Sequence, residues 1–187
     1  MEIEKKNPKI FIMCGKARHG KDTIALMLKE KYEEKNKKVL ILSYGSYIKE
    51  YAKKISNWDG KDETKPRELL QQLGTSVIRN NIDQNFFVKR MLEDIEVYSY
   101  FFDVLIISDA RLQGEVIEPR QKFKNVFAVR TVRPNFDNGL TLEQQQHITE
   151  IDLDDYKEYD YYIVNDKTLD DLKTKVENIV EDVENEY

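Results

Sequence analysis

The sequence predicts an α/β fold in which helices cover a mostly parallel sheet. Residues 10–13 (IFIM) and 38–44 (KVLILSY) are short runs of bulky, partly β-branched residues, which is typical of buried strands. A helical pattern separates these two runs, and a strand–helix–strand unit implies a parallel pair with a right-handed crossover. The chain of 187 residues has room for one such domain, 1–187, and is too short for two ordinary ones.

The remaining elements follow from local patterns. The helix predicted over 22–35 has apolar positions on one face and ends in the polar run EKNKK. Pro66 is predicted in the first turn of its helix, where a missing N–H has no intrahelical partner to lose. No internal repeat or low-complexity linker interrupts the chain. Further strands are predicted at 103–109, 125–132 and 160–165, and further helices at 43–55 after a turn, 66–80, 84–98, 142–150 and 169–183.

Residues 15–21 read G-x-x-x-x-G-K, between the first predicted strand and the first predicted helix. This spacing lets consecutive backbone N–H groups turn inward on a phosphate chain, while the Lys21 ammonium reaches the outer phosphates. The positive end of the helix dipole adds to the attraction. A tight strand-to-helix connection with no ligand is the plain alternative. Both flanks that the mechanism requires are present, which favours a phosphate-binding loop.

The residue after Lys21 departs from the strict pattern, in which a Ser or Thr hydroxyl holds Mg²⁺. Asp22 stands there, followed by Thr23. A carboxylate is a charged oxygen ligand, so Asp22 is predicted to hold the metal directly or through a water. Thr23 is then free to bond a phosphate oxygen. Within the loop, Arg18 is either a phosphate clamp or a solvent-facing residue, and His19 is interpreted as a tolerated loop residue rather than a base.

Composition and charge argue against several classes of protein. The net charge is −5 and residues 177–187 are acidic, which argues against a nucleic-acid partner. No apolar run approaches the ~20 residues of a membrane span, and residues 1–9 lack the apolar block of a secretory signal. Cys14 is the single cysteine and has no partner for an internal disulfide, which fits a reducing, cytoplasmic setting.

The chain has more predicted helices between the second and third predicted strands than a single crossover connection needs. We expect them to form a small lobe, 46–100, of the kind that carries substrate near strand ends. Asp109 ends the third predicted strand, where an acidic residue can orient a Mg²⁺ shell. Arg130 and Arg133 lie at the exit of the fourth, before a turn-rich loop.

Together these segments resemble the phage-type deoxynucleoside monophosphate kinases, a branch of the P-loop nucleotide kinases, over nearly the whole chain. The resemblance implies a three-layer P-loop NTPase fold with about five strands in the order 2-3-1-4-5, an acceptor lobe and a lid over 130–150. It also implies transfer of the γ-phosphoryl group of Mg²⁺-bound ATP to a (deoxy)nucleoside monophosphate. The matching segments are GKARHGKDT (15–23), RELLQQLGTSVIR (67–79), SDARLQGEV (108–116), RTVRP (130–134), and H-x-x-E (147–150) followed by DYYIVND (160–166).

The same resemblance implies roles by position. The donor ATP would contact Gly15, Lys16, Ala17, Arg18, His19, Gly20, Lys21, Asp22, Thr23, Asn165 and Lys167. The acceptor would contact Tyr44, Ser46, Arg67, Gly74, Thr75, Arg79, Arg111 and Glu115. Lys21, Arg130 and Arg133 would be catalytic, and Asp22 and Asp109 would serve the metal. Leu112 and Gly114 depart from the family's Phe and Asn, which leaves the base preference open.

Alternatives stay open at this stage. Arg67 and Arg79 can be surface residues of one helix, and Asp109 can be a cap. A kinase of another small phosphorylated metabolite or cofactor precursor would share the loop, as would a non-catalytic nucleotide sensor. A GTPase is disfavoured because the sequence has no N-K-x-D motif, and an ABC-type ATPase because it has no LSGGQ-like segment. The expected partners are small-molecule nucleotides, for a monomer or homodimer in the cytoplasm of a bacterium or phage-infected host cell.

Overall fold

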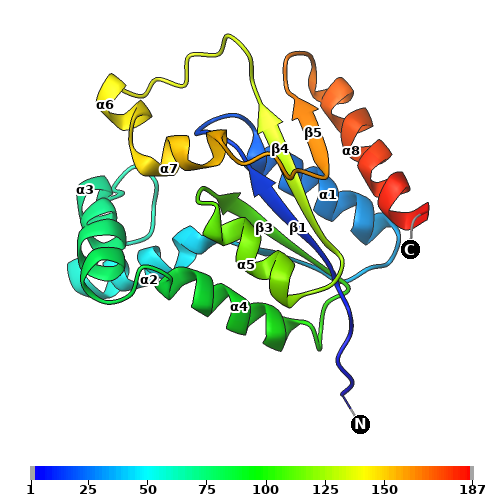
Figure 1. Ribbon diagram of the computed structural model, residues 1–187, viewed down its shortest axis with the longest axis horizontal. Helices are drawn as coiled ribbons and strands as arrows, with labels where there is room; N and C mark the ends of the chain where they lie inside the picture. The colour runs from blue at the N-terminus through cyan, green and yellow to red at the C-terminus, as the bar shows by residue number, and fades with distance from the viewer. Residues whose placement is uncertain (1–2, 186–187) are drawn as a thin grey trace.

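A five-stranded sheet forms the centre of the computed structural model, which describes residues 3–185 (Figure 1). The strand order is β2-β3-β1-β4-β5 and every neighbouring pair is parallel, which confirms the predicted order 2-3-1-4-5. The central strand places Ile10 opposite Leu105 on one side and opposite Val126 on the other. The strands are β1 Lys9–Cys14, β2 Val39–Leu42, β3 Val104–Ala110, β4 Val126–Val132 and β5 Tyr161–Val164.

Two helical layers cover the two faces of the sheet, because the apolar side chains of β1 alternate between them. Phe11 and Met13 pack toward α1 and α8, whereas Ile10, Ile12 and Cys14 pack toward α2, α4 and α5. All five are fully buried, and each large side chain buried in this way stabilises the fold by about 1.5–3 kcal/mol. The helices are α1 Lys21–Glu34, α2 Tyr44–Ser56, α4 Phe86–Tyr98, α5 Gly114–Lys122 and α8 Leu169–Asn185.

Between α2 and α4 the chain forms a helix of mixed type. The helix α3, Arg67–Gln71, continues directly into a π-helix, η1, Gln72–Arg79. A π-helical stretch of this length is rare and often marks a functional site. Pro66 is the N-terminal cap of α3 and lies outside the first turn in which it was predicted, so that prediction is wrong by one residue. Figure 1 shows α2, α3 and α4 gathered on one side of the sheet.

Two other predicted elements differ from the structure, and one helix is not predicted. Helix 142–150 is in fact two short helices, α6 Leu142–Gln145 and α7 Ile148–Ile151, because the His147 side chain caps α7 and interrupts the helix; a 3₁₀ turn, η2 Asp152–Asp154, follows. The helix α5 is not predicted, because it contains Gly114 and Pro119, which are residue types that disfavour helices. The strand predicted over 38–44 ends at Leu42 and α2 begins at Tyr44, so the expected separate turn is absent.

The segment after β4 crosses above the carboxyl ends of the strands before it reaches α6 and α7 (Figure 1). It therefore lies over the edge where the loop after β1 and the loop after β3 emerge. Within residues 3–185, none of the helices combines the length and apolar character needed to cross a bilayer.

Candidate active site

The loop between β1 and α1 depends on glycine at two positions. Gly15 has φ +151°, and a Cβ there would lie 2.6 Å from the backbone oxygen of Thr131. Gly20 has φ +99°, and a Cβ there would lie 2.6 Å from Nδ2 of Asn165. Only a residue without a side chain adopts these conformations at such close approach. The loop is thus shaped by backbone packing against β4 and the segment after β5.

The Lys21 side chain is buried, and its ammonium bonds back to the start of the loop. Nζ donates to the carbonyl oxygens of Gly15 at 2.7 Å and Lys16 at 2.9 Å. Burial, together with the smaller effect of the Arg111 positive charge, lowers the pKa of Lys21 to about 8. A nearby anion stabilises the charged form of a desolvated lysine, and an incoming phosphate would supply that negative charge.

A cavity of about 460 Å³ opens above this loop. Five cationic side chains and two carboxylates face it, so its charge suits a polyanion. The structure therefore brings most of the predicted donor residues together, along with Asp109, Arg111 and Arg133. The lining residues are Arg18, Gly20, Lys21, Asp22, Thr23, Asp109, Arg111, Arg133, Asn165, Lys167, Leu169 and Leu172.

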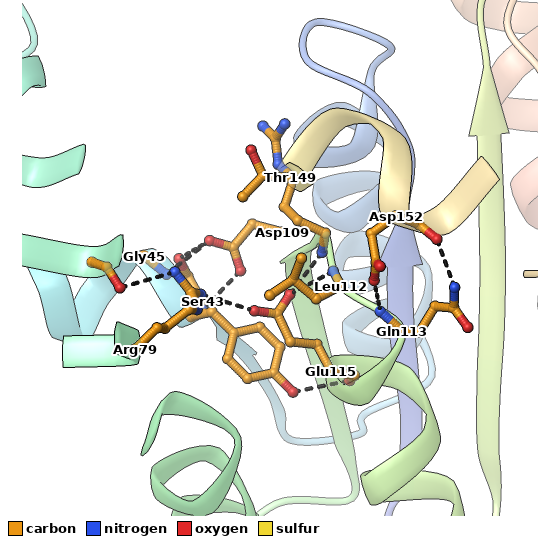
Figure 2. Close-up of polar contacts among 12 residues, drawn as sticks. Ser43, Gly45, Arg79, Asp109, Leu112, Gln113, Glu115, Thr149 and Asp152 are labelled. Carbon is orange, nitrogen blue, oxygen red and sulfur yellow. Dashed lines mark hydrogen bonds and ion pairs between the residues drawn. The ribbon is translucent and has the colours of Figure 1, made fainter. Parts of the chain in front are cut away.

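A second cavity, of about 880 Å³, lies between η1, α4 and α5. Arg79 projects into it, with its guanidinium 4.8 Å from the centre of the Phe87 ring and Nη2 3.3 Å from Oε1 of Glu115. The other oxygen of Glu115 accepts hydrogen bonds from the backbone N–H of Arg111 at 2.7 Å and of Leu112 at 3.1 Å (Figure 2). Burial raises the pKa of Glu115 to about 7.

One short segment, residues 109–115, borders both cavities, and we call it the partition. Arg111 faces the first cavity, while the next residues, Leu112–Glu115, line the second. Ile148 and Thr149 of α7, with Asp152, close the second cavity from above. Asp152, the first residue of η2 and the C-terminal cap of α7, accepts a hydrogen bond from the backbone N–H of Gln113 at 2.6 Å, which joins the end of α7 to the partition (Figure 2).

Asp22 and Asp109 differ in how their carboxylates are engaged. Asp109 accepts from the backbone N–H of Tyr44 at 2.8 Å and Gly45 at 2.9 Å and from the Ser43 hydroxyl at 2.8 Å, so it caps α2 (Figure 2). Asp22 is exposed, and within residues 3–185 its carboxylate has no hydrogen bond or ion pair. No group of three or more His, Cys, Asp or Glu residues in the described part of the chain is placed to hold a metal unaided.

The two arginines predicted for the lid are separated. Arg133 lines the first cavity, and its guanidinium lies 3.7 Å from the centre of the Phe136 ring. Arg130 is buried in β4, where Nη2 lies 3.0 Å from Oδ1 of Asp154 and the guanidinium faces Tyr159. Arg130 therefore ties the sheet to η2 and lines neither cavity.

Other predicted residues also lie outside the two linings. The buried Tyr44 hydroxyl donates to the carbonyl of Glu115 at 2.9 Å, and the Ser46 hydroxyl donates to that of Ser43 at 2.6 Å. Gly74 packs against Ile48, and Arg67 is exposed on α3. Of the predicted acceptor residues, Thr75, Arg79 and Glu115 line the second cavity, and Arg111 lines the first.

Three predicted donor residues of the loop do not line the first cavity and instead bond to other parts of the protein. They are Lys16, Ala17 and His19. Lys16 pairs with Asp154 at 2.8 Å, and Nδ1 of His19 accepts from the backbone N–H of Arg133 at 3.2 Å. Burial lowers the pKa of His19, which keeps the ring neutral as a structural acceptor. The N–H of Ala17 donates to Glu150.

Sequence reasoning missed Glu150 and Asp152 as site residues. Glu150 belongs to the H-x-x-E segment, where the sequence indicates at most a pairing with a neighbouring base, and Asp152 follows it on the chain. Each joins the end of the lid segment to a loop that lies more than thirty residues away, and nothing in the local pattern reveals such contacts.

These observations define a P-loop protein: a parallel sheet in the order 2-3-1-4-5 with a glycine-bracketed, lysine-bearing loop at the carboxyl end of its central strand. Comparison with known sequences identifies the family within this class of protein. The model of the deoxynucleotide monophosphate kinase family matches residues 36–176, and the chain belongs to that family.

Two curated relatives are phage enzymes. The chain is 32% identical over 119 residues to the deoxynucleotide monophosphate kinase of Enterobacteria phage T4, covering 63% of this chain and 46% of that protein. It is also 32% identical over 115 residues to the enzyme of the same name from Escherichia phage RB69, covering 61% and 44%. The match thus spans less than half the length of each relative.

Solved structures confirm the fold alone. The APS kinase CysC of Mycobacterium tuberculosis, in complex with AMPPNP and APS, has a TM-score of 0.59 at 16% identity, covering 94% of this chain and 99% of that one. Shikimate kinase from Bacteroides thetaiotaomicron has a TM-score of 0.57 at 12% identity, covering 94% and 98%. The predicted family and fold are both confirmed.

Proposed function

We propose that the protein transfers the γ-phosphoryl group of Mg²⁺-bound ATP to a nucleoside monophosphate, with deoxynucleotides as the expected acceptors. One observation carries this proposal: two cavities, one over the phosphate-binding loop and one beside Arg79, are bordered by the same continuous segment, 109–115. A kinase needs two such sites side by side, and a simple ATPase or sensor needs only the first. Membership of the deoxynucleotide kinase family supports the choice of acceptor.

The first cavity is the proposed donor site. Backbone N–H groups at the start of α1 and the Lys21 ammonium would hold the phosphates, as in other loops of this spacing. Arg18, Asn165 and Lys167 line the same cavity and would border the rest of the nucleotide. Nδ2 of Asn165 donates to the carbonyl of His19 at 3.1 Å, so it supports the loop from the β5 side.

The second cavity is the proposed acceptor site. The Arg79 guanidinium, steered by Glu115 and the Phe87 ring, would bind the acceptor phosphate or its nucleoside. Arg111 faces the donor side of the partition and would meet the acceptor phosphate near the transfer point. We propose the lobe 46–100 as the acceptor-binding part of a single domain and the segment 130–150 as its lid.

The residues fit a Mg²⁺ ion. Magnesium is usually held by one or two carboxylates together with substrate phosphates and waters, so a cage of protein ligands is not required. Asp22 offers an exposed, unpartnered carboxylate on the floor of the donor cavity. Asp109 would act through water, because both of its oxygens already accept hydrogen bonds from α2 and Ser43. When bound, the ion would neutralise charge on the β- and γ-phosphates.

Phosphoryl transfer asks the protein mainly for positioning and charge neutralisation. Lys21, Arg111 and Arg133 supply positive charge around the donor cavity. The lid segment would exclude water, which otherwise competes as the phosphoryl acceptor. We propose small-molecule nucleotides as its partners, in a monomer or homodimer that works in the cytoplasm of a bacterium or a phage-infected cell.

A turnover assay tests this proposal. Purified protein with Mg²⁺ and ATP is supplied with a panel of ribo- and deoxyribonucleoside monophosphates, and ADP release is followed. We expect release above the ATP-only control with at least one deoxynucleotide. No release with any monophosphate, or release only with a phosphorylated compound that is not a nucleotide, would overturn the proposal.

A further inference from the structure

One carboxylate connects the proposed donor and acceptor machinery. Oε2 of Glu150, in α7, accepts from the backbone N–H of Ala17 at 2.9 Å, and Oε1 forms an ion pair with Nη1 of Arg111. The Glu150 side chain is only 8% exposed. Three segments that are distant in sequence, the loop after β1, the loop after β3 and α7, therefore meet at this side chain.

The contacts of Glu150 leave the rest of the site available. Arg111 has five N–H donors on its guanidinium, and within the described residues only Nη1 is bonded. In the part of the chain that the structure describes, Glu150 makes no hydrogen bond to Lys21, whose ammonium donates to the carbonyls of Gly15 and Lys16. The N–H groups at the start of α1 are likewise not bonded to Glu150. Glu150 thus orients Arg111 while it occupies one N–H of the donor loop, that of Ala17, and leaves the start of α1 unbonded.

Asp152, the C-terminal cap of α7, is also tied to the acceptor side. Gln113 donates to Asp152 twice, from its backbone N–H to Oδ2 at 2.6 Å and from Nε2 to the carbonyl at 2.8 Å. Ile148 and Thr149 line the acceptor cavity on the same short helix. A shift of α7 therefore moves a wall of the acceptor cavity and the carboxylate on Arg111 together.

We propose that Glu150 is a positioning residue that holds Arg111 toward the acceptor phosphate whenever α7 is seated on the partition. The inference rests on the proposed function and goes beyond it by assigning a role to α7: the arginine that faces the transfer point is aligned by the lid segment. The guanidinium would otherwise rotate freely on a flexible stem, and small misplacements of a binding group are costly in transfer reactions.

A double-mutant cycle tests this inference. Glu150→Ala, Arg111→Ala and the double variant are compared with the parent, with ATP and monophosphate varied separately. We expect Glu150→Ala to lower kcat/KM for the acceptor by roughly 10- to 100-fold while KM for ATP stays within about twofold. The double variant should be no worse than Arg111→Ala, because Glu150 acts through that arginine.

Two further variants control the experiment. Glu150→Gln keeps an oxygen for the Ala17 N–H but lacks the charge, so it should fold like the parent and still lose acceptor efficiency. Glu181→Ala removes an exposed carboxylate of α8 that has no hydrogen-bond or ion-pair partner within the described residues, and it should match the parent. If Glu150→Ala does not fold, Glu150→Gln takes its place in the cycle.

Three results would overturn the inference. Losses that multiply in the double variant would mean that Glu150 acts independently of Arg111. Tighter ATP binding by Glu150→Ala, with unchanged acceptor kinetics, would mean that the carboxylate is instead an anion that competes with phosphate. A parent protein that turns over no monophosphate would overturn the proposed function and this inference with it, whereas the first two results leave the proposed function standing.

Discussion

The donor and acceptor cavities are built in different ways. The donor loop is one continuous stretch, residues 15–23, whose shape comes from glycine backbone geometry and from packing against β4. The acceptor cavity is assembled from η1, α4, the partition and α7, and its features are side chains such as Arg79 and Glu115. A site made from backbone is specified locally, whereas a site made from side chains depends on tertiary structure.

This difference predicts how each cavity responds to change. The donor loop should be sensitive to backbone substitutions and insensitive to the identity of most of its side chains. The acceptor cavity should show the reverse, with large effects from single side chains and tolerance of backbone variation. The four predictions below test that contrast, from the largest expected effect to the smallest.

Lys21→Ala should reduce kcat by roughly 10²- to 10³-fold or more, because the ammonium compensates charge that develops on the transferring group. The fold should persist, since the ammonium bonds only to loop carbonyls. Steady-state kinetics with circular dichroism checks both points. Lys124→Ala, at an exposed lysine in the turn before β4, is the matched control. A folded Lys21→Ala protein of near-normal activity would contradict the donor assignment.

Arg79→Ala should raise KM for the monophosphate by about 10- to 100-fold, as expected when a hydrogen bond to a charged group is lost. It also leaves Glu115 buried without its ion-pair partner. KM for ATP should change little. Arg90→Ala, at an exposed arginine of α4, should behave like the parent. The exposed Arg67 should give a smaller effect than Arg79, and equal changes in both KM values would count against the acceptor site.

Gly15→Ala should destabilise the protein by about 1–3 kcal/mol through backbone strain, with a further loss from the contact with Thr131. Gly114→Ala is the matched change on the acceptor side. No atom lies within 4 Å of a Cβ at Gly114, which opens α5, so we expect little change or a small gain. Urea unfolding of both variants measures this. Equal destabilisation would argue against the backbone-built donor loop.

The pH dependence of donor binding should reflect Lys21. Its pKa is about 8 in the protein without nucleotide, so the ammonium loses its proton as the pH rises through that value. ATP affinity should therefore fall by up to about tenfold per pH unit above 8, with proton uptake on binding. Calorimetry at several pH values measures this, and Lys21→Ala should lack the dependence. Arginines stay charged throughout, so monophosphate binding should not follow the same curve.

The same contrast explains what the sequence could predict. The strand order, the loop and Asp22 follow from short local patterns and from resemblance to a family, and the structure places most donor residues around one cavity. The contacts of Glu150 and Asp152 join distant segments, so no local pattern reveals them. The π-helical geometry of η1 is likewise not predicted. Arg130 could not be told from Arg133 by position, because burial beneath Asp154 and Tyr159 is a tertiary property.

The most direct test of the account follows the phosphoryl group itself. ATP labelled at the γ-phosphate is incubated with Mg²⁺, a deoxynucleoside monophosphate and either the parent protein or Lys21→Ala, and the products are separated. The account predicts that the parent moves the label into the nucleoside diphosphate and that Lys21→Ala leaves it in ATP. Label released only as inorganic phosphate, or label that stays in ATP with the parent protein for every deoxynucleotide tried, would contradict transfer between the two cavities.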